Sequence, residues 1–318
     1  MLEYYRQFTE LKNASGAIYW AIGVFDGLHL GHQAVIQSAV AAAHRCGARA
    51  GVLTFANHPL TLVRPDLAPA AIIPDEKEKL QLLAQLGVDL VLNLEFTSAL
   101  AGLEPYEFIQ TLCTCSDTCG ISIGEDWHFG RGGVGNVCLL RELAQEFGFD
   151  VTVVAPVIAK GARISSTRIR KAIQAGQFSD VAAMLTRPYA WFGEVIQGKQ
   201  LARTLNYPTA NIRPTGVLPP FGVYAVRVEI RGEFYFGVAN LGIRPTVAAQ
   251  QGELMLEVHI FDFDSDIYGE QLCVQPIAFL RPECKFASLV ELQAQLANDS
   301  FQAKSICKGK NWLQNFLN

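Results

Sequence analysis

The sequence predicts an α/β protein: a doubly wound parallel sheet, followed by antiparallel β-structure that forms either a barrel or a sandwich. Up to about residue 186, continuous apolar runs alternate with segments of helical spacing, which is typical of a parallel sheet covered on both faces. From residue 187, short runs rich in Val, Phe, Tyr and Ile recur with little helix before Ser288, which indicates antiparallel β-structure. We therefore expect two domains, residues 1–186 and residues 187–318.

Composition and net charge limit which kinds of protein this chain can be and which partners it can have. The chain has 318 residues, of which 50% are hydrophobic and 18% charged, as expected for a globular protein with a good core. Its apolar runs are shorter than a bilayer span, and its first residues resemble no secretory signal, so we expect a cytoplasmic protein without membrane partners. The net charge of −4 argues against general nucleic-acid binding. We expect small-molecule partners, and the sequence leaves the oligomeric state open.

Eight cysteines are scattered along the chain, and we expect reduced thiols. Cys113, Cys115 and Cys119 form a small cluster, but no fourth ligand stands at a familiar zinc spacing. The role of this cluster stays open.

In the first half, the apolar run 17–24 is expected to be a buried strand that leads through a polar turn into a helix over 33–46. The other expected strands are residues 49–55, 88–94, 121–123 and 150–158. The other expected helices are residues 76–86 (capped by Asp75), 104–113, 138–147 and a helix opened by Ser165.

Four polar segments each follow an expected strand. They are the turn Gly23–His32, the loop around Asn57, the loop around Asp126 and the turn at Ser165. Because ligands bind at the carboxyl ends of parallel strands, we expect these segments to gather on one rim of the sheet.

The turn Gly23–His32 has the chemistry of a phosphate site. A helix that begins near His32 directs free backbone N–H groups and its positive dipole end at the turn. Gly27 and Gly31 allow a tight backbone, and His29 and His32 can donate hydrogen bonds. A histidine pair at this spacing also fits a helix cap, and a metal site would need a third ligand, which is not evident.

A second helix start strengthens this interpretation. The hydroxyls of Ser165, Ser166 and Thr167 precede a helix, although such residues are first of all N-caps. Basic side chains stand beside them, namely Arg163, Arg168 and Arg170. Two phosphate-binding helix starts on one rim are a stronger signal than either alone.

In the second half, the expected strands are residues 189–196, 222–230, 233–240, 254–262 and 271–279, with helix from Ser288 and a terminal segment at 311–317. The loop 198–203 could wrap phosphates, although it is not a Walker motif. Thr209 and Asn211 lie on one side of an extended chain and offer oxygen ligands that suit Mg²⁺. Glu257 shares a strand face with His259, and is a candidate general base if that face points inward. All of these also fit ordinary polar positions at the rim of a barrel.

Four motifs of the first half resemble the FMN adenylyltransferase module of bacterial bifunctional riboflavin kinase/FAD synthetases, which are HxGH nucleotidyltransferases. These are GVFDGLHLGH, TFANHP, GEDWHFG and RISSTRIRKAI. The resemblance implies that His29 and His32 bind ATP phosphates and stabilise charge on the transferring α-phosphate. It assigns further residues to the nucleotide and flavin site: Gly23, Phe25, Asp26, Gly27, Gly31, Asn57, Asp126, Arg163, Ser166, Thr167 and Arg170. Asn57 stands where the family often has Pro, and Gly133 where it often has Arg.

Motifs of the second half resemble a bacterial riboflavin kinase domain, which implies a β-barrel with terminal helices. These are GKQLARTLNYPTANI, GVYAV, VANLGIRPTV and LEVHIFDFDSDIYGE. The resemblance implies that Thr209 and Asn211 engage Mg²⁺ and ATP phosphates and that Glu257 deprotonates the ribityl 5′-hydroxyl. The loop with Gly198, Lys199 and Arg203 would cover the nucleotide. Glycine is usual in the family at three positions that differ here, Ala202, Asn206 and Ser265.

The resemblances together predict two activities in one chain. The barrel would phosphorylate riboflavin to FMN with ATP, and the first domain would join FMN to the AMP part of a second ATP. One alternative is an FAD synthetase whose barrel only binds flavin, because Ala202 adds a methyl group where the backbone approaches phosphate. Others are a nucleotidyltransferase for a different phosphorylated substrate, and a flavin-binding regulator without activity.

Overall fold

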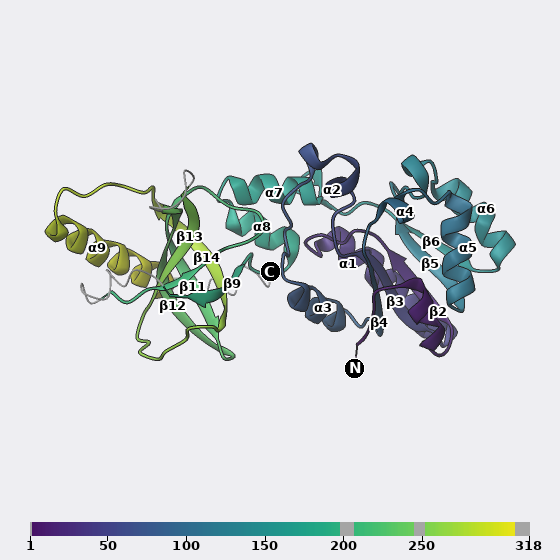
Figure 1. Cartoon of the computed structure of the whole chain (residues 1–318), viewed down its shortest axis with the longest axis horizontal. Helices are drawn as coiled ribbons and strands as arrows, with labels where there is room; N and C mark the ends of the chain where they lie inside the picture. Colours follow the sequence, from purple (N-terminus) through teal and green to yellow (C-terminus); the bar gives the residue numbers. More distant parts are fainter. Residues whose placement is uncertain (1, 198–206, 245–251, 309–318) are drawn as a thin grey trace. The chain divides into compact units, whose positions relative to one another are not determined.

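The computed structural model describes residues 2–197, 207–244 and 252–308. The chain divides into two compact units, Met1–Ser166 and Thr167–Asn318 (Figure 1). The division falls at the start of helix α7 (Ser166–Gln174), so α7 and α8 (Phe178–Leu185) are counted with the barrel. The functional boundary expected after residue 186 stays a prediction.

The first unit is built on a six-stranded parallel sheet in the order β1-β4-β3-β2-β5-β6. The strands are β1 (Glu3–Tyr5), β2 (Ile18–Ile22), β3 (Arg49–Phe55), β4 (Leu90–Leu94), β5 (Thr118–Gly124) and β6 (Asp150–Val154). The chain proceeds from β2 through β3 to β4 on one side, and β5 and β6 lie on the other side of β2. The parallel sheet expected from the sequence is confirmed.

Helices cover both faces of this sheet (Figure 1). On one face, α1 (Leu30–Cys46) and α3 (Glu76–Gln85) pack against side chains such as Tyr19 of β2. On the other, α5 (Pro105–Cys115) and α6 (Val137–Phe147) pack against side chains such as Trp20. Successive residues of β2 therefore serve opposite cores, which explains why the strand is apolar throughout.

The aromatic side chains of β2 require small neighbours. A Cβ at Gly51 of β3 would lie 2.6 Å from the Trp20 ring, and one at Gly120 of β5 would lie 2.1 Å from the Tyr19 ring. These two glycines therefore allow the large rings of the central strand to lie across the strands beside it.

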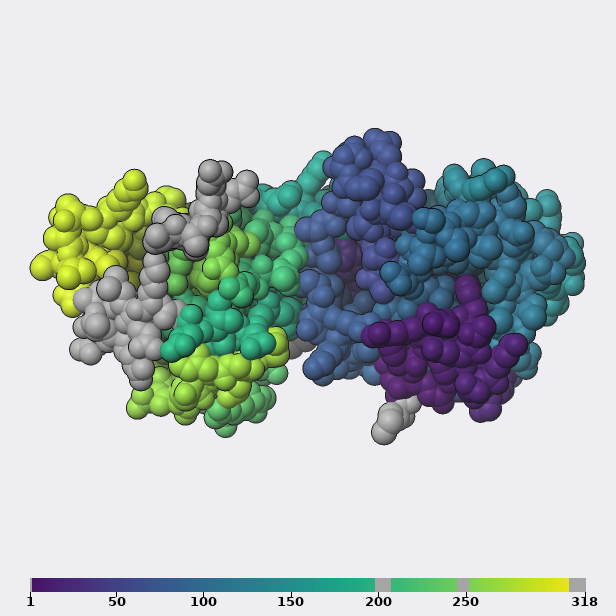
Figure 2. Space-filling model, viewed as in Figure 1, coloured from purple at the N-terminus to yellow at the C-terminus, as the bar shows by residue number. Residues whose placement is uncertain are grey.

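Several short elements of the first unit were not predicted from the sequence. They are β1, η1 (Phe8–Asn13), α2 (Leu60–Val63), η2 (Pro65–Leu67), α4 (Ser98–Ala101), η3 (Arg131–Gly133) and the hairpin β7 (Ile158–Ala159) with β8 (Ala162–Arg163). The segment with α2 and η2 forms part of the blue surface in Figure 2, where Leu62, Val63 and Leu67 are exposed.

The second unit contains a closed antiparallel barrel in the order β10-β13-β12-β11-β14-β9. Its strands are β9 (Trp191–Ile196), β10 (Ala210–Ile212), β11 (Gly222–Ile230), β12 (Glu233–Arg244), β13 (Glu253–Ile260) and β14 (Gln271–Arg281). Pairing of β10 with β9 closes the ring, so the structure selects the barrel over the sandwich. The short β10 was not among the strands expected from the sequence.

One long helix, α9 (Leu289–Lys308), packs against β11, β12 and β14. Its buried Asp299 accepts hydrogen bonds from the Arg281 guanidinium at 2.7–3.1 Å. The expected terminal segment at 311–317 lies outside the described residues. Within the part of the chain that the structure describes, no helix is long and apolar enough to cross a membrane.

Candidate functional site

The turn that follows β2 lies where the order of the sheet changes direction. β2 pairs with β3 on one side and with β5 on the other, so loops after these three strands meet at one edge. Asn57 follows β3 and Asp126 follows β5. Ligands bind at such switch points of open α/β sheets, and the expected gathering of these loops holds for the three central strands.

His29 caps helix α1. Its Nδ1 accepts the backbone N–H of His32 at 3.3 Å, so the helix begins at Leu30, three residues earlier than expected. Because Nδ1 is the acceptor, a neutral His29 carries its proton on Nε2. The two imidazoles stack with centroids 3.6 Å apart. The pair is therefore held rigidly at the positive end of the α1 dipole.

The backbone of the turn is strained and tightly packed. Phe25 and Leu28 have φ of +49° and +45°, which side chains other than glycine rarely adopt. Gly27 has φ of +87°. A Cβ at Gly31 would lie 3.1 Å from the His29 ring, so the absence of a side chain there lets the histidine sit over the helix start.

Polar contacts tie the turn to distant segments. The Asp26 carboxylate accepts the backbone N–H of Ile72 at 2.9 Å. The Ser166 hydroxyl donates to the Asp26 carbonyl at 3.0 Å. Of the residues expected at the second helix start, Ser166 is thus brought to the turn.

Lys79 of α3 contacts the start of the turn. It was not singled out from the sequence. Its Nζ donates to the Val24 carbonyl at 3.2 Å and to the Thr54 hydroxyl at 3.0 Å. Burial lowers the pKa of Lys79 from 10.5 to about 8, while the charges of Asp26 and Glu76 act in the opposite direction. A signal was present: Lys79 stands one helical turn before Leu83, which is fully buried, so both lie on the same face of α3.

Two adjoining cavities open beside the turn. One, of about 110 Å³, is lined by Phe25, Asp26 and Lys79 among others. The second, of about 840 Å³, is lined by Asn57 among others, and the two share Ala56, Glu76 and Asn93. The Asn57 amide is itself engaged: it accepts the Phe96 N–H at 2.7 Å and donates to the Phe96 carbonyl at 3.1 Å. Asn57 therefore lines the second cavity while it holds the loop to the segment after β4.

Asp126 and Arg163 form an ion pair. The guanidinium Nη2 lies 2.8 Å from both carboxylate oxygens. The hydrogen bond from Arg163 holds the pKa of Asp126 below its ordinary value. Both side chains remain about half exposed, so the pair stands at the surface of the rim.

Thr167, Arg168 and Arg170 lie on α7, in the second compact unit. Their expected contribution to the nucleotide site of the first unit stays a prediction.

In the barrel, Asn211, Glu257 and Asn240 form a row across three neighbouring strands. Asn211 of β10 and Asn240 of β12 both stand opposite Glu257 of β13, so the three side chains share a face. Asn211 is buried, and its Oδ1 and that of Asn240 are without a hydrogen-bond partner among the described residues. Buried acceptors normally have partners, so these oxygens indicate a site that a ligand completes.

Glu257 is partly buried and paired with Arg244. The Arg244 Nε donates to the carboxylate Oε1, and the two side chains are 29% and 25% exposed. His259 lies two residues along the strand and turns to a different partner, since its Nδ1–H donates to the Pro208 carbonyl at 2.9 Å. Burial lowers the pKa of His259, which favours a neutral ring.

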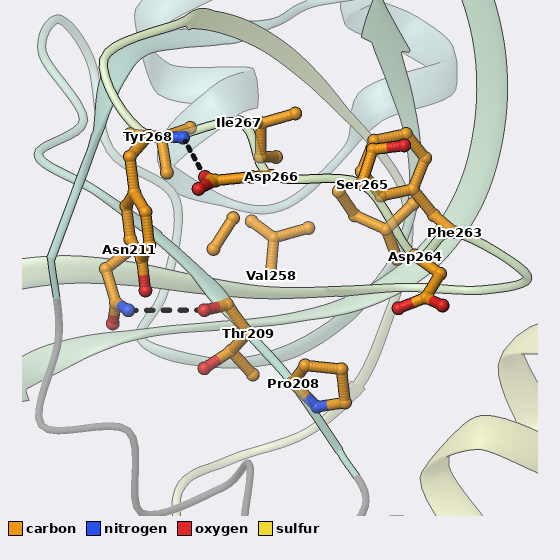
Figure 3. Close-up of a pocket in the computed structure, with 13 residues that line it drawn as sticks. Pro208, Thr209, Asn211, Val258, Phe263, Asp264, Ser265, Asp266, Ile267 and Tyr268 are labelled. Carbon is orange, nitrogen blue, oxygen red and sulfur yellow. Dashed lines mark hydrogen bonds between the residues drawn. The ribbon is translucent and has the colours of Figure 1, made fainter.

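A cavity of about 200 Å³ opens beside β10 (Figure 3). Thr209 and Asn211 line it from one side, with the Asn211 amide donating to the Thr209 carbonyl at 3.4 Å. The segment Phe263–Tyr268 lines it from the other. β13 contributes Val258 and Ile260 to the lining, and Glu257 is not among the lining residues. Strand pairing places Glu257 beside Asn211. Thr209, in contrast, lines a cavity that Glu257 does not line.

Two family models match this chain. A model described as FAD synthetase matches residues 11–168, and one described as riboflavin kinase matches residues 185–307. A bifunctional riboflavin kinase/FMN adenylyltransferase from Listeria monocytogenes is 38% identical over 88% of this chain and 89% of its own length. The enzyme of that name from Escherichia coli K12 is 39% identical, over 89% of this chain and 90% of its own. The chain belongs to the bifunctional riboflavin kinase/FMN adenylyltransferase family.

A solved structure agrees with the fold. A crystal structure from Streptococcus pneumoniae, described as that of a macrolide-efflux protein, has a TM-score of 0.81 and 32% identity. The matched region covers 94% of this chain and 97% of the chain in that structure. The nucleotidyltransferase sheet and the kinase barrel expected from the motifs are both present.

Besides Asn57, two of the positions that depart from the family pattern lie among the described residues. Gly133 has φ of +67°, a backbone conformation that glycine adopts without strain and arginine does not. Ser265 lines the barrel cavity (Figure 3). Gly198, Lys199, Ala202, Arg203 and Asn206 lie outside the described residues, and their expected roles stay predictions.

All eight cysteines are free thiols. Burial raises the pKa of Cys113 and Cys119 to about 11, so both are protonated at neutral pH. Within residues 2–197, 207–244 and 252–308, no three or more His, Cys, Asp or Glu side chains are arranged so that they could hold a metal ion.

Proposed function

We propose that the barrel phosphorylates riboflavin to FMN with ATP, and that the first unit joins FMN to the AMP part of a second ATP, yielding FAD and pyrophosphate. One observation carries the proposal: a single chain holds the stacked His29–His32 pair at the start of α1 and the Asn211–Glu257 pair across a closed barrel. Membership of the family supports both halves.

Adenylyl transfer requires alignment and charge neutralisation more than a base, because the FMN phosphate is already anionic at neutral pH. We assign His29 and His32 to the ATP phosphates, where Nε2 of His29 donates and the α1 dipole adds positive potential. Arg163, Ser166, Thr167 and Arg170 hold the triphosphate. Gly23, Phe25, Asp26, Gly27 and Gly31 shape the turn, and Asn57 and Asp126 border the flavin or nucleotide.

For riboflavin phosphorylation, we assign Glu257 as the base that accepts the proton of the ribityl 5′-hydroxyl. Thr209 and Asn211 would hold Mg²⁺, and the buried Oδ1 of Asn211, without a partner among the described residues, fits a hard cation. Such an ion, when bound, would neutralise phosphate charge on ATP. The loop with Gly198, Lys199 and Arg203 is assigned to the nucleotide.

We further propose that residues 1–186 act as the adenylyltransferase domain and residues 187–318 as the kinase domain, in a cytoplasmic enzyme. The riboflavin kinase match begins at residue 185, which supports that boundary. The eight free thiols suit a reducing compartment.

Incubation with riboflavin, ATP and Mg²⁺, followed by chromatography of the flavins, tests the proposal. FAD with transient FMN is expected. FMN left unformed, with FAD made only when FMN is supplied, would identify an FAD synthetase whose barrel merely binds flavin.

Variants separate the two sites. His29→Ala combined with His32→Ala should abolish FAD formation and leave FMN formation intact, since only the first unit loses its phosphate donors. Exposed His44 at the far end of α1 offers the matched control His44→Ala, which should behave as wild type.

Glu257→Gln should have the reverse effect, abolishing FMN formation while added FMN is still converted to FAD. Glu253→Gln, on the same strand, is its control. Loss of both activities from either change in a folded chain would contradict the assignment of two sites.

A further inference from the structure

Lys79 is the one lysine among the described residues whose amine is placed at the backbone that begins the turn. It projects from the same face of α3 as buried Leu83, and it donates to the Val24 carbonyl and the Thr54 hydroxyl. Thr54 in turn donates to the same Val24 carbonyl at 2.9 Å. The carbonyl, the hydroxyl and the amine thus form a closed triangle of hydrogen bonds.

The triangle of hydrogen bonds fixes Val24, which lies between β2 and the strained turn. Val24 follows the end of β2 and precedes Phe25, the first of the two strained non-glycine residues of the turn. A peptide fixed at this point limits how the strained backbone relaxes. Phe25 also meets the His32 ring edge-on at 5.4 Å, so displacement of Val24 would be passed on to the stacked histidines.

The amine is placed at a cost in stability. The cavity beside it has acidic groups on two sides, Asp26 from the turn and Glu76 from α3, and His58 lines the same space. Even so, burial lowers the pKa of Lys79 to about 8. Burial of the charged amine opposes folding, so its hydrogen bonds to the Val24 carbonyl and the Thr54 hydroxyl indicate that it is kept to position the turn.

We propose that Lys79 is a positioning residue for adenylyl transfer, whose ammonium group fixes the Val24 carbonyl and thereby the turn that presents His29 and His32. The inference rests on the proposed function of the first unit. Lys79 acts through the backbone and need not touch the substrates.

Lys79→Met tests the proposal, with Lys77→Met, an exposed lysine on the same helix, as its matched control. Lys79→Met should lower kcat for FAD formation from FMN by about 10- to 100-fold, with KM for ATP changed little, because misplacing reactive groups by about 1 Å has effects of this size. Formation of FMN from riboflavin, which occurs in the barrel, should be unchanged in the same preparation.

The melting temperature separates positioning from a structural role. The folded chain holds the Lys79 proton less tightly than the unfolded chain, since the pKa falls from 10.5 to about 8. Folding is therefore favoured as pH rises from about 8 towards 10.5, and at neutral pH the charged amine opposes it. Replacing Lys79 by Met should leave the melting temperature unchanged or raise it.

The pH profile of the wild-type chain gives a readout that does not depend on the Met variant folding. Its rate of FAD formation should fall as pH rises through about 8, where the Lys79 ammonium loses its proton. Lys79→Arg, which stays charged, should retain activity and lose this alkaline fall.

Two results would overturn the inference, and a third would refute the proposed function on which it rests. The first is a Lys79→Met chain as active in FAD formation as Lys77→Met. The second is a loss of activity accompanied by a lower melting temperature and an unchanged alkaline limb in Lys79→Arg. The third, a wild-type chain that forms no FAD from FMN, would instead refute the proposed function itself.

Discussion

Arg244 and Glu257 form an ion pair between neighbouring strands of the barrel, and the pair limits what Glu257 can do. The guanidinium donates to one carboxylate oxygen, which fixes the rotamer of a side chain that would otherwise be free to turn. A base must be held within hydrogen-bond reach of the proton it accepts. We therefore assign Arg244 the role of orienting Glu257.

Arg244→Met is expected to lower kcat for FMN formation by about tenfold, because the proposed base loses its fixed orientation. The rate of FAD formation from added FMN should not change. Arg213→Met is a matched control, since Arg213 pairs with Glu253 on the same strand β13. Chromatography of flavins at saturating riboflavin measures the effect. If kcat for FMN formation were unchanged or higher, Arg244 would pair with the Glu257 carboxylate without orienting it for catalysis.

At single residues, the sequence predicted the identity of candidate site residues better than their hydrogen-bond partners. The motifs predicted His29 and His32, and their spacing also fitted a helix cap; the structure shows that His29 caps α1. Asn57, expected near the flavin or nucleotide, lines a cavity, and its amide is hydrogen-bonded to the Phe96 backbone. The contacts of Asn57 with Phe96 join residues 39 positions apart in the chain, and no local pattern specifies them.

Among the elements, α9 is tied to the barrel by one buried ion pair. The Asp299 carboxylate is 1% exposed, and it receives hydrogen bonds from Arg281 and from Gln295 at 2.8 Å. A buried pair adds little net stability when compared with apolar residues, but removing one partner leaves a buried charge uncompensated.

Asp299→Ala is accordingly expected to destabilise the barrel by about 3 kcal/mol. Urea unfolding followed by hydrogen exchange of the backbone amides of β11 and β14, which belong to this unit, measures the loss. Exposed Glu291 on the same helix provides the control Glu291→Ala, for which a much smaller change is expected. Equal effects of the two substitutions would mean that the pair with Arg281 does not anchor α9.

Long elements were predictable and short ones were not. The strand over 49–55 and the helix beginning at Glu76 follow from apolar runs, helical spacing and caps. Strand β10 has three residues, too few for a periodic pattern, although it carries Asn211. The register that places Asn211 opposite Glu257 depends on how strands 46 residues apart pair, which spacing along the chain cannot reveal.

In the whole molecule, each compact unit has its own sheet and its own candidate site. FMN is the product of one site and the substrate of the other in the proposed sequence. Nothing in the chemistry of either site requires that FMN remain bound to the chain that made it.

We therefore expect a mixture of two inactive variants to recover the overall reaction. The His29→Ala, His32→Ala chain forms FMN, and the Glu257→Gln chain converts it, so riboflavin and ATP should yield FAD only when both are present. Each variant alone is the control. Accumulation of FMN without FAD in the mixture, while the wild-type chain forms FAD, would mean that FMN passes only within one chain.

The closure of the barrel has a consequence for self-association. A closed ring leaves no edge strand to which a second chain could add, whereas an open sheet has two. In the first unit these are β1, which is only three residues long and carries Glu3 in an ion pair with Arg49, and β6, whose sequence DVTVV is mostly apolar. Parallel sheets also form slowly. When chains are concentrated during overproduction, aggregation should therefore begin from β6 rather than from the barrel.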